Sequence, residues 1–423
     1  MQRGLAAALL CATAVSLAAS AEDALNSNDK PVNADTNPED RFKKKTDHSE
    51  GNFVPVVGGS TDIGIGGGYF ANFARLSEGF DPYLWDIESA GLITFKSGDS
   101  GIVVPYADVY AKLTIPRLFG HPIRLEVRPS FTSEQTIHYY GLGNASPSTF
   151  PVGTKDTYQE YGRTHPQFDV DLRFKLADHY SGRLGARYIR NYIALNQDSK
   201  LVDDMNNGSA EVQSLLHNPG THNVILLKTG LAWDTRDNEA STYSGAFDTV
   251  DLRVSPGGGG PFPYKYGEAT LNLRAFVPLR TPWITLAGRL VGSALFGNVP
   301  FYELSRFDDT YALGGTGGVR GIPAGRFSGK AKVLGNIELR NELVAFHALG
   351  KPLVFGIVGF LDAGRVWTDW GSQSALDGTG LGLHWGTGVG LRLQSGSAFV
   401  LRADIAYSPD GPFGGYFSAG QLF

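Results

Sequence analysis

The chain contains very little sulfur. Of its 423 residues, two are methionine and one is cysteine, Cys11, which lies within the first 21 residues. Residues 22–423 therefore have no thiol, which excludes disulfides and thiolate metal sites from this part of the chain. A chain without thiols suits an oxidising compartment such as the periplasm.

Charge is sparse as well. Charged residues make up 19% of the chain, the net charge is −5, and the one basic run is Lys43-Lys44-Lys45. No footprint for nucleic acid is visible in this distribution. The lysine triplet is interpreted as part of a solvated linker, with binding to anionic lipid head groups as the alternative. The nine histidines are scattered without metal-ligand spacing, so neither a metal nor another cofactor is expected.

The N-terminus has the order of a signal peptide. An apolar stretch from Gly4 to about Leu17 precedes Ala19-Ser20-Ala21, whose small residues are typical of a cleavage site. The apolar stretch is too short to cross a bilayer as a helix. Residues 1–21 are thus predicted to direct export, and residues 22–51, poor in apolar side chains, to form a disordered periplasmic tail.

What the sequence does have is glycine, aromatic residues and a period of two. The 55 glycines and the 12% of aromatic residues favour strands and turns over helices. From Phe168 to Leu176 every second residue is apolar and every intervening one is charged, and similar alternation recurs at 123–128, 268–275 and 401–407. A strand with this pattern has one apolar face and one polar face.

Two architectures share this alternation. A soluble sandwich turns the apolar face inward, whereas a membrane barrel turns it to lipid. The export signal, the aromatic residues near strand ends, such as Trp367 and Trp370, and a final strand that stops at Phe423 favour the barrel. We therefore predict that residues 52–423 form an all-β fold, a single 16-stranded antiparallel transmembrane β-barrel in the outer membrane of a Gram-negative bacterium.

The strands are placed between turn signals, and the three longest connections are expected to face outward. The predicted strands are 53–59, 61–74, 84–97, 102–115, 121–140, 163–177, 180–196, 221–235, 245–255, 264–280, 283–298, 331–346, 352–369, 380–395, 397–409 and 414–423. The long connections are 141–162, 197–220 and 299–330.

The connection 299–330 carries the most distinctive charged residue, Arg320, within Val319-Arg320-Gly321. Alternation places Glu338 on the inner face of one following strand and allows Asp362 the same orientation on the next. If the loop folds into the lumen, a guanidinium with five fixed donors can bridge both carboxylates. Spacing alone leaves a second interpretation equally open, in which Arg320 is solvated and Asp362 is a charge of the lumen wall.

Motifs for catalysis are weak. Gly314 to Gly318 resembles a phosphate-binding loop only in its glycines, because no Lys-Ser or Lys-Thr follows. A barrel-embedded lipid hydrolase would pair His138 or His384 with a serine, but no glycine-flanked serine turn is present. The chain is therefore not expected to be an enzyme.

At the arginine loop the chain resembles the bacterial surface antigen superfamily of outer-membrane assembly barrels, which contains BamA, TamA and two-partner secretion transporters. The resemblance covers nearly the whole chain after the signal peptide, and its most specific feature is the pairing of the arginine loop with a Phe-x-Asp-x-Gly strand. The matching stretches are Gly314 to Phe327, Phe360 to Trp367, Tyr140 to Asn144, Asp234 to Asn238 with Gly245 downstream, and Phe423.

The resemblance implies an inward-folded sixth loop whose arginine locks onto the lumen wall. The residues that it implies for this loop lock are Val319, Arg320, Gly321, Glu338, Phe360, Asp362 and Gly364. It also implies a weak seam between the first and last strands that opens sideways, and proline and glycine there would weaken strand pairing. The residues assigned to the seam are Pro55, Gly58, Gly59, Gly414, Gly415, Gly420 and Phe423.

The chain departs from the family pattern at two places. It has Ile322 where members usually carry an aromatic residue, and residues 22–51 are too few for one periplasmic POTRA domain. This points to a barrel-only branch. The resemblance implies insertion or translocation of proteins, and in some members lipids, with outer-membrane lipids, unfolded outer-membrane protein clients or a periplasmic adaptor as partners and a homo-oligomer left open. The alternative is a passive pore or structural barrel that has lost its client machinery.

Overall fold

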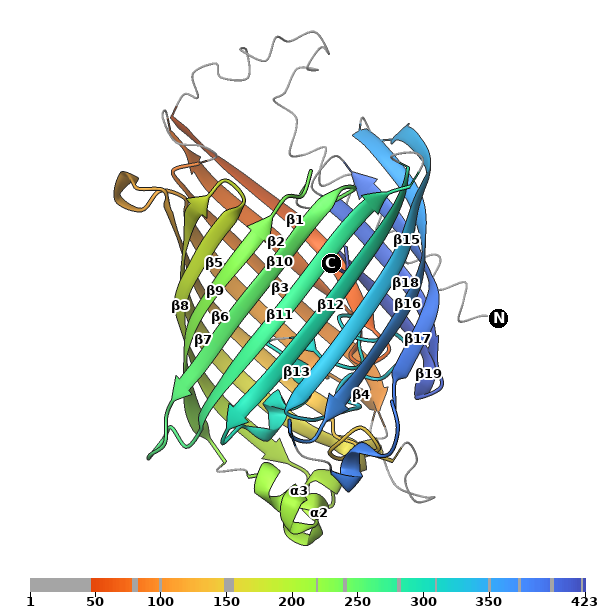
Figure 1. Ribbon diagram of the computed structural model, residues 1–423. Helices are drawn as coiled ribbons and strands as arrows, with labels where there is room; N and C mark the ends of the chain where they lie inside the picture. The colour runs from red at the N-terminus through yellow and green to blue at the C-terminus, as the bar shows by residue number, and fades with distance from the viewer. Residues whose placement is uncertain are drawn as a thin grey trace.

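The computed structural model describes residues 47–77, 83–98, 101–147, 156–217, 220–238, 242–279, 283–308, 310–348, 351–371, 374–395, 399–419 and 421–423. The predicted signal peptide, most of the predicted tail and Gly420 lie outside these residues. The described chain is a β-barrel (Figure 1).

The strands of the first half are β1 (His48–Ser60), β2 (Gly64–Leu76), β3 (Trp85–Gly98), β4 (Gly101–Val103), β5 (Tyr106–Ile115), β6 (Ile123–His138), β7 (Glu160–Ala177), β8 (Tyr180–Leu195), β9 (His222–Asp234) and β10 (Gly245–Pro256). Those of the second half are β11 (Lys265–Pro278), β12 (Ile284–Gly297), β13 (Arg306–Phe307), β14 (Thr310–Tyr311), β15 (Ala331–Ala348), β16 (Lys351–Trp367), β17 (His384–Ser395), β18 (Phe399–Ser408) and β19 (Gly411–Ala419). Two short α-helices, α2 (Lys200–Asn207) and α3 (Ala210–Leu215), lie between β8 and β9.

The long strands pair antiparallel with their neighbours along the chain, and β1 meets β19 to close the barrel. The predicted strand 102–115 is divided into β4 and β5 around Pro105, which has no N–H to donate to a ladder. β13 and β14 form a separate hairpin inside the connection from β12 to β15. With β4 and β5, which both pair with β3, counted as one strand, the remaining strands make a closed 16-stranded antiparallel barrel, which confirms the predicted fold class.

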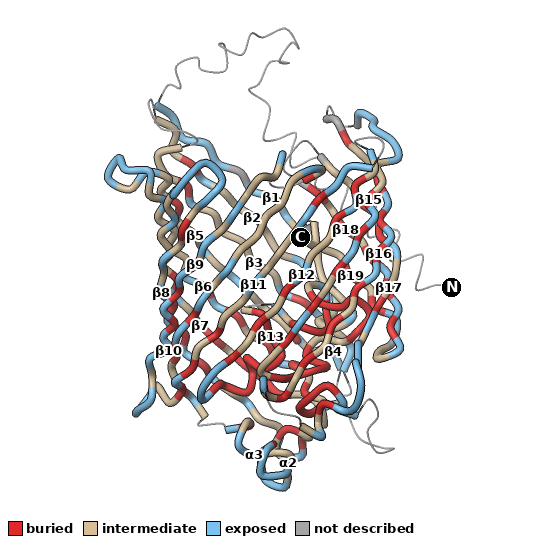
Figure 2. Tube along the Cα trace, in the orientation of Figure 1, coloured by how far each residue is buried: buried red, intermediate tan, exposed pale blue. Residues whose placement is uncertain are grey.

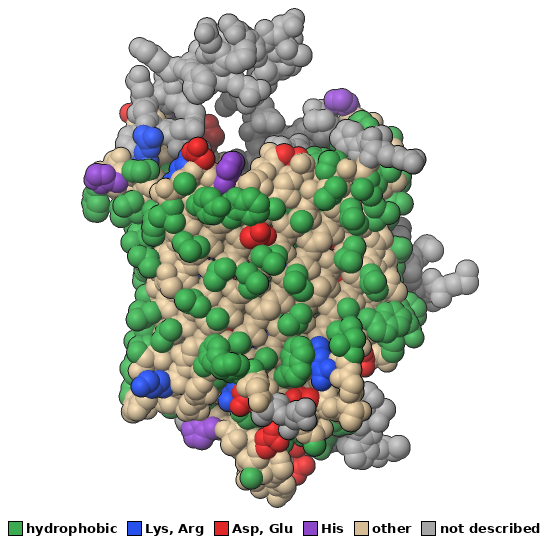
Figure 3. Space-filling model, viewed as in Figure 1, with side chains coloured by type: hydrophobic (Ala, Val, Ile, Leu, Met, Phe, Trp, Pro, Cys, Tyr) green, Lys and Arg blue, Asp and Glu red, His purple; other side chains and the backbone are tan. Residues whose placement is uncertain are grey.

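Alternation places apolar residues outside and polar residues inside. On β15, Ile337 and Leu339 are 53% and 47% exposed on the outer face, whereas Asn336 and Glu338 are at most 1% exposed on the inner face. Figure 3 shows hydrophobic side chains spread over the outer wall, with charged side chains mainly toward its two ends. A surface of this kind is stable against lipid and would be costly in water.

The two ends of the barrel differ. Short turns join strands at one end, such as residues 178–179 between β7 and β8, whereas the described parts of the connections 139–159, 196–221 and 298–330 all lie at the other. Figure 2 shows that buried residues concentrate in the half of the barrel nearer to α2 and α3. The lumen is therefore packed toward its long-loop end.

The helical cap contributes to this packing. Ser199 and Ser209 begin α2 and α3 by accepting hydrogen bonds from the N–H groups of Val202 and Val212, at 3.4 and 3.3 Å. The buried apolar side chains of the cap belong to one cluster with residues of the 298–330 connection, among them Tyr302. None of the helices in the described chain is long and apolar enough to span a membrane.

The predicted boundaries differ most at the two ends of the chain. β1 begins at His48, so residues 48–51, assigned to the tail, belong to the first strand. β19 ends at Ala419, and Phe423, expected on the last strand, lies in the lumen instead. Its ring lies 6.2 Å from that of Phe276 and its main-chain oxygen accepts a hydrogen bond from Nη2 of Arg340 at 3.0 Å.

Candidate functional site

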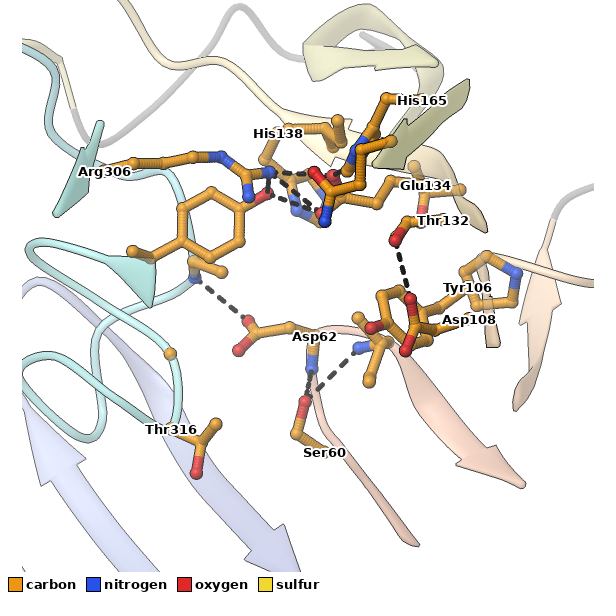
Figure 4. Close-up of a pocket in the computed structure, with 18 of the residues that line it drawn as sticks. Ser60, Asp62, Tyr106, Asp108, Thr132, Glu134, His138, His165, Arg306 and Thr316 are labelled. Atoms are coloured by element: carbon orange, nitrogen blue, oxygen red, sulfur yellow. Dashed lines mark hydrogen bonds and ion pairs between the residues drawn. The ribbon is translucent and has the colours of Figure 1, made fainter. Parts of the chain in front are cut away.

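The connection 298–330, here called the luminal loop, folds into the barrel and docks against the inner wall. Its first half is held by Arg306, whose Nη2 lies 2.9 and 2.8 Å from the two carboxylate oxygens of Glu134 on β6. His165 on β7 lies 3.1 Å from the same carboxylate. Figure 4 shows these side chains meeting on one side of a cavity of about 300 Å³, with Asp62 on the other side.

The second half of the luminal loop is held by Arg320, which is 0% exposed. Its Nε and Nη2 donate to the two oxygens of Asp362, at 2.7 and 2.9 Å, which is the bidentate geometry of a strong arginine–carboxylate pair. Its Nη1 donates to Glu338 at 2.7 Å. The structure thus brings together the three charged residues that the sequence singled out.

A third carboxylate completes the shell around Arg320. Asp404 on β18 accepts from Nη1 at 3.1 Å, so the guanidinium contacts the acidic side chains of three strands, β15, β16 and β18. Arg340 and Arg392 balance this charge, because they donate to Glu338 and Asp404 at 2.9 and 2.5 Å. Each buried carboxylate therefore has more than one cationic or hydrogen-bonding partner, as burial of charge requires.

Phe360 packs on Arg320, and nearby glycines leave room for the luminal loop against the wall. The guanidinium carbon lies 3.4 Å from the ring centre of Phe360, so the ring face covers the cation. A Cβ at Gly386 would lie 1.9 Å from the main-chain oxygen of Arg320, and one at Gly364 would lie 2.2 Å from Leu313. Gly321 itself has φ +93°, a conformation that glycine adopts without strain.

Apolar residues beside Arg320 anchor the loop tip. Val319 and Ile322 are both 0% exposed and belong to a buried cluster with Phe307, Leu313 and Phe327 of the same loop and residues of the wall. Ile322, which stands where members of the family usually carry an aromatic residue, thus packs into this buried cluster.

The luminal loop also contacts both sides of the seam region, namely β19 and the turn that follows β1. The N–H of Gly321 donates to the hydroxyl of Tyr416 on β19 at 2.9 Å. The N–H of Ala324 donates to Asp62, in the turn between β1 and β2, at 3.2 Å. Burial of Asp62 raises the pKa of its carboxyl above the ordinary value.

The seam itself is short. β1 and β19 are paired at two positions, Gly59 with Phe417 and Ser60 with Tyr416, and the N–H of Thr61 donates to Gly415 at 3.1 Å. On its other side β1 pairs with β2 at thirteen positions.

The other predicted seam residues have different positions. Pro55 and Gly58 lie on β1 beyond the stretch that pairs with β19, and Gly414 pairs with Ala406 of β18. Phe423 packs in the lumen and is not part of the seam, because the chain leaves the barrel wall after β19.

The histidines considered for catalysis have other partners. Nδ1 of His384 lies 2.9 Å from Asp410 and its Nε2 lies 3.0 Å from the main-chain oxygen of Asn144, so both ring nitrogens are engaged. Nε2 of His138 lies 3.7 Å from Glu160.

Several residues of the site were not predicted from the sequence. Asp404 and Arg402 were placed on one face of their strand by alternation, but nothing in the sequence said that this face lies beside Arg320. The pair of Glu134 and Arg306 joins residues far apart in the chain, and only the register of the barrel brings them together.

Comparisons with known proteins agree with this geometry. The Omp85 superfamily domain matches residues 107–423. BamA from Haemophilus ducreyi lacking POTRA domains 1–3 is similar in structure, with a TM-score of 0.59, 15% identity, and coverage of 89% of this chain and 70% of that one. CdiB from Escherichia coli has a TM-score of 0.53 and 15% identity over 88% of this chain and 62% of its own. Comparison with curated proteins gives no significant match.

These two solved structures, at 15% identity, establish the shared barrel fold. The family match covers about three quarters of the sequence, including the luminal loop with Arg320 and the strands that bind it. The chain therefore belongs to the Omp85 superfamily of outer-membrane β-barrels.

Proposed function

We propose that this barrel inserts or translocates proteins at the bacterial outer membrane by opening the seam between β1 and β19. The observation that carries the proposal is the pairing of these strands at only two positions. In the described chain, β1 from His48 to Gly58 has no pairing with β19. An unpaired strand edge presents N–H and C=O groups with which an incoming strand can pair.

The luminal loop is proposed to control the seam from inside. Arg320 fixes the loop to β15, β16 and β18, while Gly321 and Ala324 reach Tyr416 on one side of the seam and Asp62 beside the other. Movement of the loop would therefore break or strain contacts on both sides of the seam. The mechanism uses strand exchange and no covalent chemistry.

The proposed route to the membrane is export through the periplasm under the signal peptide, residues 1–21. Unfolded outer-membrane proteins are the proposed clients, delivered freely or by a periplasmic adaptor. A passive pore is the weaker candidate, because apolar residues of α2, α3 and the luminal loop pack together at the long-loop end.

The test is a disulfide across the seam. Continuing the register of Gly59 with Phe417 by one residue places Gly58 opposite Ser418, and a Cβ at Gly58 meets nothing closer than 3.8 Å. The protein without its signal peptide has no other cysteine, so the variant with G58C and S418C forms one defined bond. Folding of an added unfolded outer-membrane protein is then followed in liposomes with the seam oxidised or reduced.

A disulfide that leaves the seam free serves as the control. Val57 and Gly67 are partners within the fully paired β1 and β2, so V57C with G67C stiffens β1 without joining it to β19. We expect faster client folding than in empty liposomes, lost on oxidation of the seam pair and kept on oxidation of the control pair. Equal rates in empty, locked and unlocked liposomes would rule out insertion by this barrel alone.

A further inference from the structure

A second luminal cavity, of about 720 Å³, lies between the inner faces of β7 to β12 and β15 and the luminal loop. Its lining is strongly basic. The charged residues that line it are Arg173, Arg183, Arg236, Arg253, Arg274, Arg289, Asp234, Asp251 and Asp308. The proposed insertion through the seam does not use this cavity.

Four of these arginines have carboxylate partners. Arg183 pairs with Asp251 at 2.8 Å and Arg236 with Asp234 at 2.7 Å. Arg173 lies 3.4 Å from Glu126, and Arg253 contacts Asp308 and Glu268. Arg274 and Arg289 are different, because in the described chain no carboxylate oxygen lies within 4.0 Å of either guanidinium.

The hydrogen-bond partners of the two guanidinium groups are neutral, whereas the main-chain N–H of Arg274 donates to Asp248 at 3.0 Å. Nε of Arg274 donates to the side-chain oxygen of Asn272 at 3.2 Å. Nε of Arg289 donates to Asn336 at 2.9 Å, and its Nη2 donates to the main-chain oxygen of Gly317 at 2.6 Å. Most of the ten N–H donors that two guanidiniums carry are thus left for another acceptor.

Arg274 and Arg289 are also direct partners across the ladder between β11 and β12. Like charges directly opposite each other on one face of a sheet destabilise it. Elsewhere in the lumen, carboxylates neutralise such charge. Arg320 contacts three carboxylates and Arg183 pairs with Asp251. A pair of guanidinium groups that faces a cavity, with no carboxylate oxygen within 4.0 Å among the described residues, has the charge, the donors and the space for an anion.

We propose that Arg274 and Arg289 form a binding site for a soluble phosphate-bearing solute. Two guanidinium forks match the oxygens of a phosphate group, which can accept from both at once. The phosphate belongs to a soluble molecule and not to a lipid, because β15, β16, β17, β18 and β19 separate β12 from the seam and an acyl chain that entered there would have to cross the polar lumen. This inference is independent of the proposed insertion function.

The test is calorimetric titration of the full chain, in detergent free of phospholipid, with inorganic phosphate and with pyrophosphate. We expect one saturable site with a Kd below about 1 mM, weakened about ten-fold or more by R274Q. R274Q is the primary variant because Arg289 also holds the luminal loop through Gly317. R289Q is expected to weaken binding in the same way.

R183Q is the matched control. It removes the same charge from the same cavity, but Arg183 is already paired with Asp251. We expect R183Q to change the phosphate affinity less than about three-fold, since charge beyond the site contributes only through the wider field. Equal weakening by R183Q and R274Q, or no saturable phosphate binding by the wild-type chain, would overturn the site.

A second arm separates the two sources of phosphate. The chain is reconstituted in vesicles of phosphatidylglycerol or phosphatidylcholine in phosphate-free buffer, and its urea unfolding is compared for wild type and R274Q. If inorganic phosphate fails to bind in detergent while phosphatidylglycerol alone stabilises the wild type over R274Q, the ligand is a lipid and the assignment to a soluble solute is wrong. No difference between the lipids agrees with a soluble ligand.

Discussion

Two arginine sites in the lumen lie a few strands apart along the sheet and are built on opposite principles. Arg320 is 0% exposed and contacts Glu338, Asp362 and Asp404. The guanidinium groups of Arg274 and Arg289 have only neutral hydrogen-bond partners among the described residues, and both border a cavity.

One row of the sheet links the two sites. Arg274 is the partner of Arg289, Arg289 of Asn336, and Asn336 of Asp362, along β11, β12, β15 and β16. Asn336 donates to Asp362 at 2.8 Å while its oxygen accepts from Arg289. An amide thus separates a guanidinium that three carboxylates neutralise from two guanidinium groups that no carboxylate contacts among the described residues. The difference teaches that Arg320 stabilises the fold, while Arg274 and Arg289 have donors free for the proposed ligand.

The largest effect is expected at the compensated site. R320A leaves three buried carboxylates without their shared cation, which should lower the free energy of unfolding by about 3–5 kcal/mol. Urea unfolding in liposomes, or loss of the folded band on cold gel electrophoresis, measures this change. R124A is the control, because Arg124 is half exposed beside Glu126 and such pairs contribute about 1 kcal/mol or less. An equal effect of both variants would contradict a special role for Arg320.

A smaller loss is expected at the carboxylate that sequence reasoning missed. D404N keeps the shape of the side chain but removes the charge beside Arg320 and Arg392, whose Nη1 atoms lie 3.1 and 2.5 Å from its oxygens. Hydrogen bonds to charged groups contribute about 1.5–3 kcal/mol, so the free energy of unfolding should fall by about that amount. The same unfolding measurement applies, and an unchanged midpoint would show that Glu338 and Asp362 suffice.

The alternation of apolar and polar residues in a strand predicts some features of the site and leaves others open. Alternation fixes which face each residue occupies, so the inner positions of Glu338 and Asp362 were predictable, as was the order of the strands. It does not fix where a long loop descends or which inner charge lies beside it, so Asp404 and the pair of Arg306 with Glu134 could not be found. The inward turn of Phe423 was missed because a terminal aromatic residue is equally compatible with a lipid-facing strand end.

The uncompensated site should respond with the opposite sign. R274Q removes the repulsion between Arg274 and Arg289, so in phosphate-free buffer the free energy of unfolding should rise by about 0.2–1 kcal/mol. Urea unfolding of the two proteins at equal ionic strength measures the change. R183Q, which breaks the pair with Asp251, should lower stability instead. A loss of stability in R274Q without phosphate would mean that Arg274 is already neutralised by its surroundings.

The smallest effect concerns the turn that ties the luminal loop to the seam. Burial raises the pKa of Asp62, so the folded chain binds this proton more tightly than the unfolded chain does. Ionised Asp62 therefore lowers stability at neutral pH, and this penalty fades as pH falls through the raised folded-state pKa. D62N should remove the dependence while its amide oxygen still accepts from Ala324, so the stability of wild type relative to D62N should increase as the solution is acidified in that window. The difference is read from unfolding midpoints of both proteins at matched pH values, which cancels the titration of all other carboxylates. A difference that stays constant with pH would show that burial does not shift the pKa of Asp62 in the folded barrel.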